Sequence, residues 1–199
     1  MLPLGVRARG WIVTGVVGLI AALLRLIGLN HPRTLMFDEI YYVKDAYSLW
    51  HLGYEAAWDD KAGSADAAFA MGDFSKLTDS AAYVVHPQLG KWLIGLGMEA
   101  LGQTDPVGWR IVTAICGVIT VFLLCRLAQN LFHSPLLTLL AGLFLATDGI
   151  AIVMSRTSIL DGYLAMFALA AFLCVVKDQQ MSRPTLTSKL TAWDGIGTP

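Results

Sequence analysis

The sequence has 199 residues, of which 56% are hydrophobic and 15% are charged, and its formal net charge at pH 7 is −1. This composition excludes an ordinary soluble domain, because such domains contain fewer apolar and more charged residues. The nearly balanced charge gives no indication of a nucleic-acid partner.

The hydrophobic residues fall into four blocks, each close to the roughly 20 residues with which a helix crosses the hydrocarbon core of a bilayer. We therefore predict an all-α polytopic membrane protein with four spans and a long loop after the first span. The predicted spans are residues 11–29, 107–125, 135–154 and 157–176, and the predicted loop is residues 30–106.

Two arginines, Arg7 and Arg9, precede the first block, a feature that it shares with secretory signal peptides. The block is long for the apolar part of a signal peptide and lacks a small-x-small cleavage site, so we favour a membrane span. Basic residues in short connections mark the cytoplasmic side of a membrane. They predict a multi-pass plasma-membrane protein with a cytoplasmic N-terminus and an external loop. These residues are Arg7, Arg9, Arg126, Lys177, Arg183 and Lys189.

Asp38 and Glu39 place two adjacent carboxylates just after the first block, among aromatic side chains. Apolar residues recur at helical spacing over 34–52, which predicts a juxtamembrane helix that begins near the acidic pair. The helix dipole favours carboxylates in a first turn, so a purely structural role is one explanation of the pair. The other explanation is chemistry, because carboxylates near lipid headgroups need a partner or a use.

Later parts of the predicted loop carry weaker signals. Residues 54–80 are rich in Ala, Gly, Ser and Asp and show little periodicity, which predicts a flexible, solvated insertion. An amphipathic run over 92–98 is too short to span a bilayer, so we predict an interfacial helix there. His86 and Lys91 precede this run and are candidates for binding an anionic group, although His86 alone is explained as well by capping of the turn at Pro87.

Five charged residues are predicted at one depth, near the outer ends of the spans. A charge costs on the order of 3 kcal/mol at the bilayer centre, so their convergence indicates a polar cavity that opens outward. Each of them is also explained structurally, as a link between helix ends or a side chain that reaches the headgroups. The five residues are Arg25, Arg110, Asp148, Arg156 and Asp161.

Several motifs, in this order on this predicted topology, together resemble the protein O-mannosyltransferases, and more specifically the bacterial, actinobacterial-type branch of this GT-C family. The resemblance extends from about residue 8 to residue 178. It implies a GT-C type N-terminal membrane module over 1–178, followed by a polar tail over 179–199. The motifs are an N-terminal span, Phe37-Asp38-Glu39-Ile40-Tyr41-Tyr42, His86-Pro87-Gln88-Leu89-Gly90-Lys91, Thr147-Asp148-Gly149, and Ser155-Arg156 with Leu160-Asp161.

The resemblance implies transfer of mannose from polyprenyl-phosphate-mannose to Ser or Thr hydroxyls of exported proteins. The reaction is expected outside the plasma membrane, with the export machinery as a further partner. In such enzymes the Asp of the acidic pair is the essential carboxylate, so Asp38 is the predicted catalytic residue, with Glu39 beside it. The family's essential arginine after the third span corresponds to Arg156.

The chemistry of these residues agrees with the implied roles. A hydroxyl that attacks an anomeric carbon needs a positioned base, which Asp38 supplies, and attack opposite the phosphate inverts the anomeric centre. A leaving phosphate needs cations rather than an acid. No metal ligand is predicted and no cofactor is required, and the use of a divalent cation is left open. The predicted residues for substrate and donor-phosphate binding are Arg156, His86, Lys91, Asp148 and Asp161.

Two alternatives stay open at this point. A GT-C transferase of another sugar, such as aminoarabinose or arabinose, shares the Asp-Glu segment and acts on lipid or glycan. A non-catalytic membrane subunit would use the external loop to bind a partner. The chain also departs from the family at Gln88 and Gly149, where Pro and Asn are usual. Family members have many more spans, so we expect this chain to be a truncated part of such an enzyme.

Overall fold

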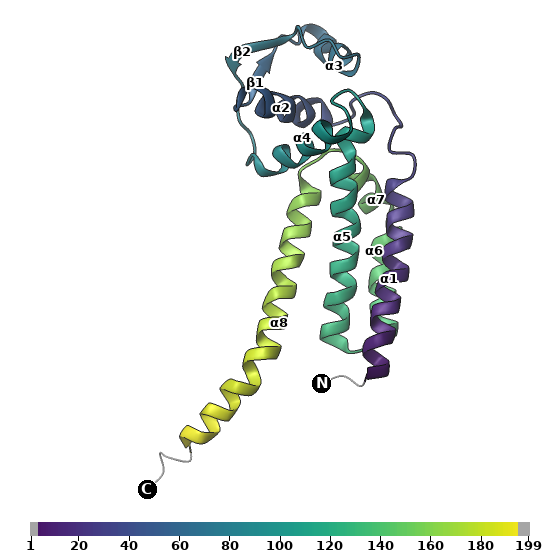
Figure 1. Ribbon diagram of the computed structural model, residues 1–199, viewed down its shortest axis with the longest axis vertical. Helices are drawn as coiled ribbons and strands as arrows, with labels where there is room; N and C mark the ends of the chain where they lie inside the picture. Colours follow the sequence, from purple (N-terminus) through teal and green to yellow (C-terminus); the bar gives the residue numbers. More distant parts are fainter. Residues whose placement is uncertain (1–3, 195–199) are drawn as a thin grey trace.

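The computed structural model describes residues 4–194, which contain eight α-helices, one 3₁₀-helix and two short strands. Long helices form a bundle, and a smaller folded unit sits at one end of it (Figure 1). We call this unit, residues 30–105, the cap. The prediction of an all-α protein is confirmed, because the two-stranded sheet is a minor part of the chain.

In the described part of the chain, three helices are long and apolar enough to span a membrane. They are α1 (Leu4–Leu26), α5 (Pro106–Phe132) and α8 (Asp161–Asp194). A fourth candidate span consists of α6 (Pro135–Thr147) and α7 (Gly149–Arg156), which meet at an angle of 58°. These helices make the chain a multi-pass membrane protein.

The third predicted span, residues 135–154, differs from a single straight helix. Asp148 has an extended backbone and ends α6. Its carboxylate then accepts a hydrogen bond from the backbone N–H of Ala151 at 2.6 Å, which caps the start of α7. An Asp in this position favours the start of a new helix over the continuation of the old one. The span is therefore broken near the end at which the cap lies.

The last helix also differs from its predicted bounds. The fourth span was predicted over 157–176, but α8 begins at Asp161, whose carboxylate lies in the first helical turn, where the helix dipole favours it. The helix continues through Pro184 to Asp194 and so includes most of the predicted polar tail. Residues 195–199 of that tail lie outside the described residues.

Local sequence explains two other helix starts in the bundle. Asp105 and Ser134 cap α5 and α6, and each is followed by a proline at the first helical position. A proline is tolerated there because the first N–H groups of a helix have no intrahelical partner. α1 packs against α5 and α6, and α8 packs against α5. Gly142 lets α6 approach closely, because a Cβ there would overlap Cys125 Sγ of α5.

The cap consists of short elements around an aromatic core. The elements are α2 (Glu39–Leu52), β1 (Ala56–Trp58), a 3₁₀-helix (Lys61–Gly63), α3 (Ser64–Ala70), β2 (Leu77–Ala81) and α4 (Leu89–Leu101). β1 and β2 pair antiparallel, and α4 packs between α2 and α5 (Figure 1). The core of the cap continues into the bundle through Trp109 of α5, which is fully buried.

The two helices predicted in this region are present, whereas the interfacial position of the second stays a prediction; one further prediction is wrong. α2 begins at the acidic pair, and α4 covers the amphipathic run 92–98. Residues 54–80 were predicted to be a flexible, solvated insertion, but they form ordered elements of the cap. Phe69 of α3 is fully buried and its ring contacts those of Tyr47 and Trp58. The sequence of this segment shows little periodicity because each of its elements is too short for a repeating pattern.

Candidate functional site

The two carboxylates of the acidic pair lie in different environments. Glu39 is fully buried, whereas Asp38 is half-buried and borders a groove in the cap. Asp38 is the N-cap residue of α2, but its carboxylate accepts no capping hydrogen bond. Within residues 4–194, this carboxylate has no hydrogen-bond or ion-pair partner. Asp38 is therefore the member of the pair that is free to react.

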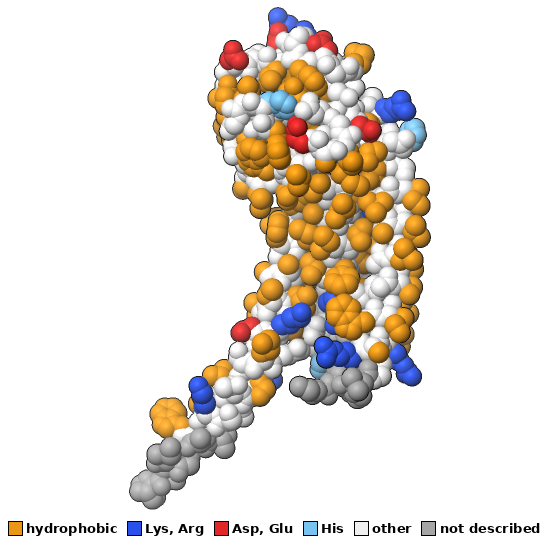
Figure 2. Space-filling model, viewed as in Figure 1, with side chains coloured by type: hydrophobic (Ala, Val, Ile, Leu, Met, Phe, Trp, Pro, Cys, Tyr) orange, Lys and Arg blue, Asp and Glu red, His pale blue; other side chains and the backbone are white. Residues whose placement is uncertain are grey.

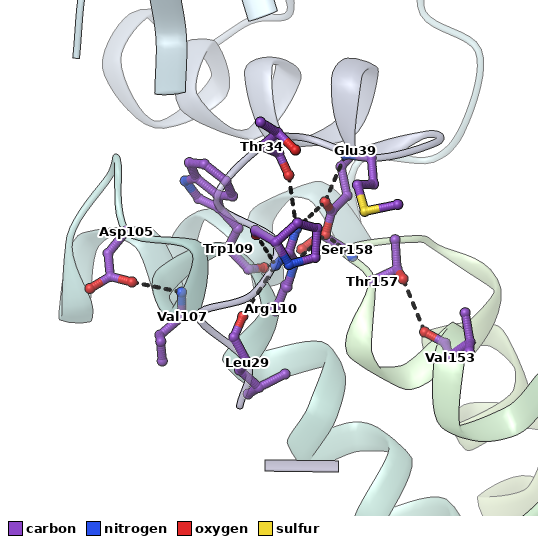
Figure 3. A network of polar contacts seen from close by, with 12 residues as sticks. Leu29, Thr34, Glu39, Asp105, Val107, Trp109, Arg110, Val153, Thr157 and Ser158 are labelled. Atoms are coloured by element: carbon purple, nitrogen blue, oxygen red, sulfur yellow. Dashed lines mark hydrogen bonds and ion pairs between the residues drawn. The ribbon is translucent and has the colours of Figure 1, made fainter. Parts of the chain in front are cut away.

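The Glu39 carboxylate accepts four hydrogen bonds (Figure 3). Two come from Arg110, whose Nε and Nη2 donate to Oε1 and Oε2 at 2.7 Å each. The backbone N–H of Met36 donates to Oε2 at 3.0 Å, and that of Ser158 donates to Oε1 at 2.9 Å. Such a bidentate, charge-assisted pair is strong and directional. Glu39 has no exposed surface with which to contact a substrate.

Arg110 completes this network from the bundle side (Figure 3). Besides its bonds to Glu39, it donates to the carbonyls of Leu29 at 3.1 Å, Pro32 at 2.8 Å and Thr34 at 3.1 Å. All five guanidinium N–H groups thus have acceptors, which is the condition for burying an arginine without a large penalty. The ion pair ties α5 to the segment after α1 and to the first residue of α2. It thereby fixes the backbone that carries Asp38.

The backbone just before Asp38 is in an unusual conformation. Phe37 has a φ of 52°, in the left-handed region that non-glycine residues rarely occupy. Such conformations cost of order 1–3 kcal/mol and persist only where neighbouring contacts hold them. Here the hydrogen bond from Met36 to Glu39 and the N–H of Glu39 itself, which donates to the Met36 carbonyl at 3.0 Å, close the turn. The strain is therefore located next to the unpaired carboxylate.

The groove beside Asp38 has a volume of about 430 Å³ and lies between the start of α2, β1 and the segment after β2. Four aromatic side chains line it, Tyr41, Tyr42, Trp58 and Tyr83. Its charged lining residues are Asp38, Asp45, Asp60 and Lys44. Lys44 is neutralised by ion pairs with Asp60 at 3.5 Å and Asp66 at 2.7 Å. The groove is therefore aromatic and electronegative.

Lys91 does not reach an open site in this structure. Its side chain is 1% exposed, and Nζ lies 2.6 Å from Glu55 Oε2 and 3.0 Å from Asp45 Oδ2. Burial raises the pKa of Asp45, and the hydrogen bond and charge of Lys91 oppose this shift. The three residues connect α4 to α2 and to the segment before β1. Lys91 thus holds the cap together, and its predicted role toward a donor phosphate is not supported by this environment.

Tyr42 is the side chain around which the other predicted residues gather. The exposed His86 ring packs edge-to-face against it, with ring centroids 5.7 Å apart, and Lys91 Nζ lies 5.8 Å from its centroid. Burial raises the pKa of Tyr42, and the negative charges of Asp38, Asp161 and Asp45 raise it further. Both effects oppose ionisation of the Tyr42 hydroxyl. Sequence reasoning missed it as a site residue, although it lies in the same motif as the acidic pair.

The remaining predicted arginine, Arg156, caps a helix. Its guanidinium is half-buried and donates to the carbonyls of Leu24 at 2.9 Å, Ile27 at 2.6 Å and Gly28 at 3.1 Å, where α1 ends. A cation at a helix C-terminus also complements the helix dipole. Arg156 borders a second groove of about 240 Å³, which includes Met36 from the turn before Asp38. It forms no ion pair with any carboxylate of residues 4–194.

The other charges predicted at this depth also serve helix ends. Arg25 is 1% exposed and donates to the carbonyls of Leu145 and Ala146 at 3.0 Å each, so it satisfies the end of α6 at the break. Asp148 caps α7, as described above. Asp161 is exposed in the first turn of α8, near Tyr42. Asp38, His86 and Asp161 all lie near Tyr42. Arg25, Asp148 and Arg156 instead have the structural role that was the alternative explanation, because each satisfies backbone groups at a helix end.

No group of three or more His, Cys, Asp or Glu side chains among the described residues is arranged to hold a metal ion. Lys44, which lines the groove, forms ion pairs with Asp60 and Asp66 and so occupies the space between these two carboxylates. The absence of a required cofactor remains a prediction.

The family described as dolichyl-phosphate-mannose-protein mannosyltransferase matches residues 85–198. A polyprenol-phosphate-mannose–protein mannosyltransferase from Mycolicibacterium smegmatis is 36% identical over 180 residues, which are 89% of this chain and 31% of the relative. A protein of the same name from Mycobacterium tuberculosis is 33% identical over 94% of this chain and 32% of the relative. Another, from Corynebacterium glutamicum, is 31% identical over 90% of this chain and 32% of the relative. No solved structure matches. The chain spans about a third of the length of these relatives.

Proposed function

The chain belongs to the dolichyl-phosphate-mannose-protein mannosyltransferase family, and on that premise we propose that it is part of an enzyme that transfers mannose from polyprenol-phosphate-mannose to Ser or Thr hydroxyls of proteins. The names of the similar proteins give this donor and a protein acceptor. The similarity extends over about nine-tenths of the chain. The chain accounts for only about a third of each relative, so the activity of the whole protein is part of the proposal.

The observation that carries the proposal is the unpaired carboxylate of Asp38 at the edge of a groove in the cap. Glu39 and Arg110 hold the turn that presents it, and the aromatic walls of the groove offer a surface for a polypeptide. A base must lie within hydrogen-bond reach of the proton that it removes. A polypeptide in the groove would bring a Ser or Thr hydroxyl within reach of Asp38. Glu39 is a positioning residue in this proposal.

The reaction follows from these positions. The acceptor oxygen attacks the anomeric carbon of mannose while Asp38 takes the hydroxyl proton. The bond between that carbon and the phosphate oxygen breaks, and polyprenyl phosphate leaves with the bonding electrons. Attack from the side opposite the phosphate inverts the anomeric centre. One carboxylate is sufficient, because the leaving phosphate needs no proton from an acid.

The anionic phosphate would lie outside the electronegative groove, because like charges repel. Arg156 and His86 are the predicted phosphate-binding residues that retain exposed surface, and their N–H donors can stabilise charge that develops on the leaving group. Lys91 is buried and already paired, so we assign it to the stability of the cap. Asp148 and Asp161 would repel a phosphate and are better suited to accept hydrogen bonds from sugar hydroxyls.

We further propose that the cap faces the outside of the plasma membrane and that the N-terminus is cytoplasmic. Lys and Arg side chains gather at the end of the bundle opposite the cap (Figure 2). The positive-inside tendency assigns that end to the cytoplasm. The acceptor would then be a protein that has crossed the membrane, with the export machinery as a neighbour.

The test is replacement of Asp38 by Asn in the intact protein, which keeps the shape but removes the base. Membranes are given isotope-labelled polyprenyl-phosphate-mannose and a Ser/Thr-rich peptide, and mannosyl peptide is measured by mass spectrometry. We expect D38N to lower transfer by about 10²–10⁴-fold, the usual contribution of a general base. The matched control is D79N, because Asp79 is exposed in β2 and lies outside the groove.

Full transfer by D38N would remove Asp38 as the base. Two other results would replace the proposed function itself. Transfer from an arabinose or aminoarabinose donor instead of the mannose donor would indicate a GT-C enzyme of another specificity. No transfer from any of these donors, together with capture of a partner by the cap, would indicate a non-catalytic subunit.

A further inference from the structure

The end of the bundle opposite the cap carries a concentration of positive charge that the proposed reaction does not use (Figure 2). Of the residues at this end whose side chains are described, six are basic and one is acidic. The basic residues are Arg7, Arg9, Arg126, Lys177, Arg183 and Lys189, and the acidic residue is Asp178. Asp178 accepts from Ser182 on its own helix and forms no ion pair with a described residue. None of these six basic residues forms an ion pair with a carboxylate in the described part of the chain.

Arg126 is the best-defined of these cations. Its guanidinium lies 3.8 Å from the ring centroid of Trp11, so it is held on the face of an aromatic side chain of α1. Its Nη1 is buried and has no acceptor. Arg7 of α1 is close enough to repel it electrostatically. Two arginines from different helices thus add positive charge to the same end of the bundle, and one of them, Arg126, has an orphaned donor.

A second orphaned donor lies one helical turn away on the same face of α5. Gln129 is 2% exposed, and its Oε1 accepts from Thr138 at 2.8 Å, but its Nε2 has no acceptor. α1 packs directly on this side chain, since a Cβ at Gly10 would lie 2.6 Å from Gln129 Cδ. The N-terminal end of the α1 dipole adds partial positive charge nearby, and no acidic residue in the first turn of α1 offsets it.

We infer that Arg126, Gln129 and Arg7 form a binding site for the phosphate of an anionic lipid headgroup. An unpaired buried donor destabilises the folded protein, and a phosphate that accepted from the orphaned donors would also relieve the repulsion between the two arginines. The aromatic and basic side chains at the end of an apolar bundle are those that meet a bilayer at its headgroups. Exposed Trp11 and Phe122 beside the site favour a phosphate that is attached to acyl chains.

Native mass spectrometry of the purified protein in detergent tests this inference. The protein is titrated with phosphatidylglycerol or with phosphatidylcholine of the same acyl chains, which differ in headgroup charge. We expect one phosphatidylglycerol to bind about tenfold more tightly than phosphatidylcholine, in keeping with charge-assisted contacts to an arginine. R126Q should remove this preference, and R126K should retain part of it, because lysine keeps the charge but not the fork of donors.

The control is K189Q, which removes a positive charge from the same end but from an exposed position on α8. If R126Q does not fold, R7Q serves instead, because Arg7 is exposed and its replacement leaves the packing intact. Equal binding of the two lipids, or an unchanged preference in both R126Q and R7Q, would overturn the site. Displacement of phosphatidylglycerol by millimolar inorganic phosphate would overturn the assignment to a lipid and indicate a soluble phosphate.

Discussion

Replacement of Glu39 by Gln tests the ion pair that positions Asp38. Glutamine has nearly the same shape, so the change removes a charge without opening a cavity. In the wild-type protein both carboxylate oxygens accept two hydrogen bonds each, from Arg110, Met36 and Ser158. The side-chain NH₂ group of glutamine is a donor, and it would replace a carboxylate oxygen that accepts from two N–H groups. Two of the four hydrogen bonds are lost, and Arg110 remains buried beside a neutral group.

The expected cost follows from this geometry. Removal of one member of a buried ion pair costs about 3–5 kcal/mol, since the other charge is left uncompensated. For a chain of this length, each kcal/mol corresponds to a shift of about 2–4 °C in the midpoint of thermal unfolding, so we expect a decrease of about 10 °C. We further expect a double replacement, E39L with R110L, to be less destabilising than the sum of its single replacements.

The assay is thermal unfolding in detergent, followed by circular dichroism, with E99Q as the matched control. Glu99 lies on α4 with its side chain 37% exposed and 3.9 Å from His51, so its loss should cost less than about 1 kcal/mol. A Glu39→Gln protein that unfolds within 1–2 °C of wild type, as the control should, would show that the buried pair does not hold the cap to the bundle.

Three further predictions concern packing, pH and substrate charge. G108A should destabilise the protein by about 1–3 kcal/mol in the same unfolding assay, because a Cβ at this position would overlap the backbone carbonyl of Gly102. G15A is the control and should be neutral or stabilising, because the space around Gly15 is open. Burial raises the pKa of Asp45 above its ordinary value of 3.8, so at a pH just above 3.8 the folded protein keeps a proton that the unfolded chain has released. The free energy of unfolding should therefore fall as the pH rises through this range, and D45N should remove this contribution to the pH dependence of unfolding. Because the groove is electronegative, acceptor peptides with Lys beside the reactive Ser should have a KM several-fold lower than peptides with Glu at that position, and high salt should reduce the difference. Equal KM values for the two peptides at low salt would exclude the groove as the acceptor site.

Much of the helical framework could be predicted from the sequence, because its determinants are local. Apolar blocks of the right length marked the spans, and the periodicity after the acidic pair marked α2. The break at Asp148 was missed although its signal was present, since Asp is a favoured N-cap residue and this one interrupts an otherwise apolar run. The folded segment over 54–80 had no comparable signal. Its order depends on Phe69, which is buried only because Tyr47 and Trp109 from other elements meet it.

The candidate site shows the same division. The sequence determined that a pair of carboxylates lies where the first span ends and that charged residues crowd one end of the bundle. Only the tertiary structure decided which carboxylate is free, because the partners of Glu39 lie 71 and 119 residues away, at Arg110 and Ser158. The structure likewise decided the role of Lys91, which is buried in an ion pair with Glu55, 36 residues earlier in the chain. Local sequence patterns determine where a charged residue lies along the chain. Long-range contacts determine whether its charge is neutralised by a partner or left unpaired.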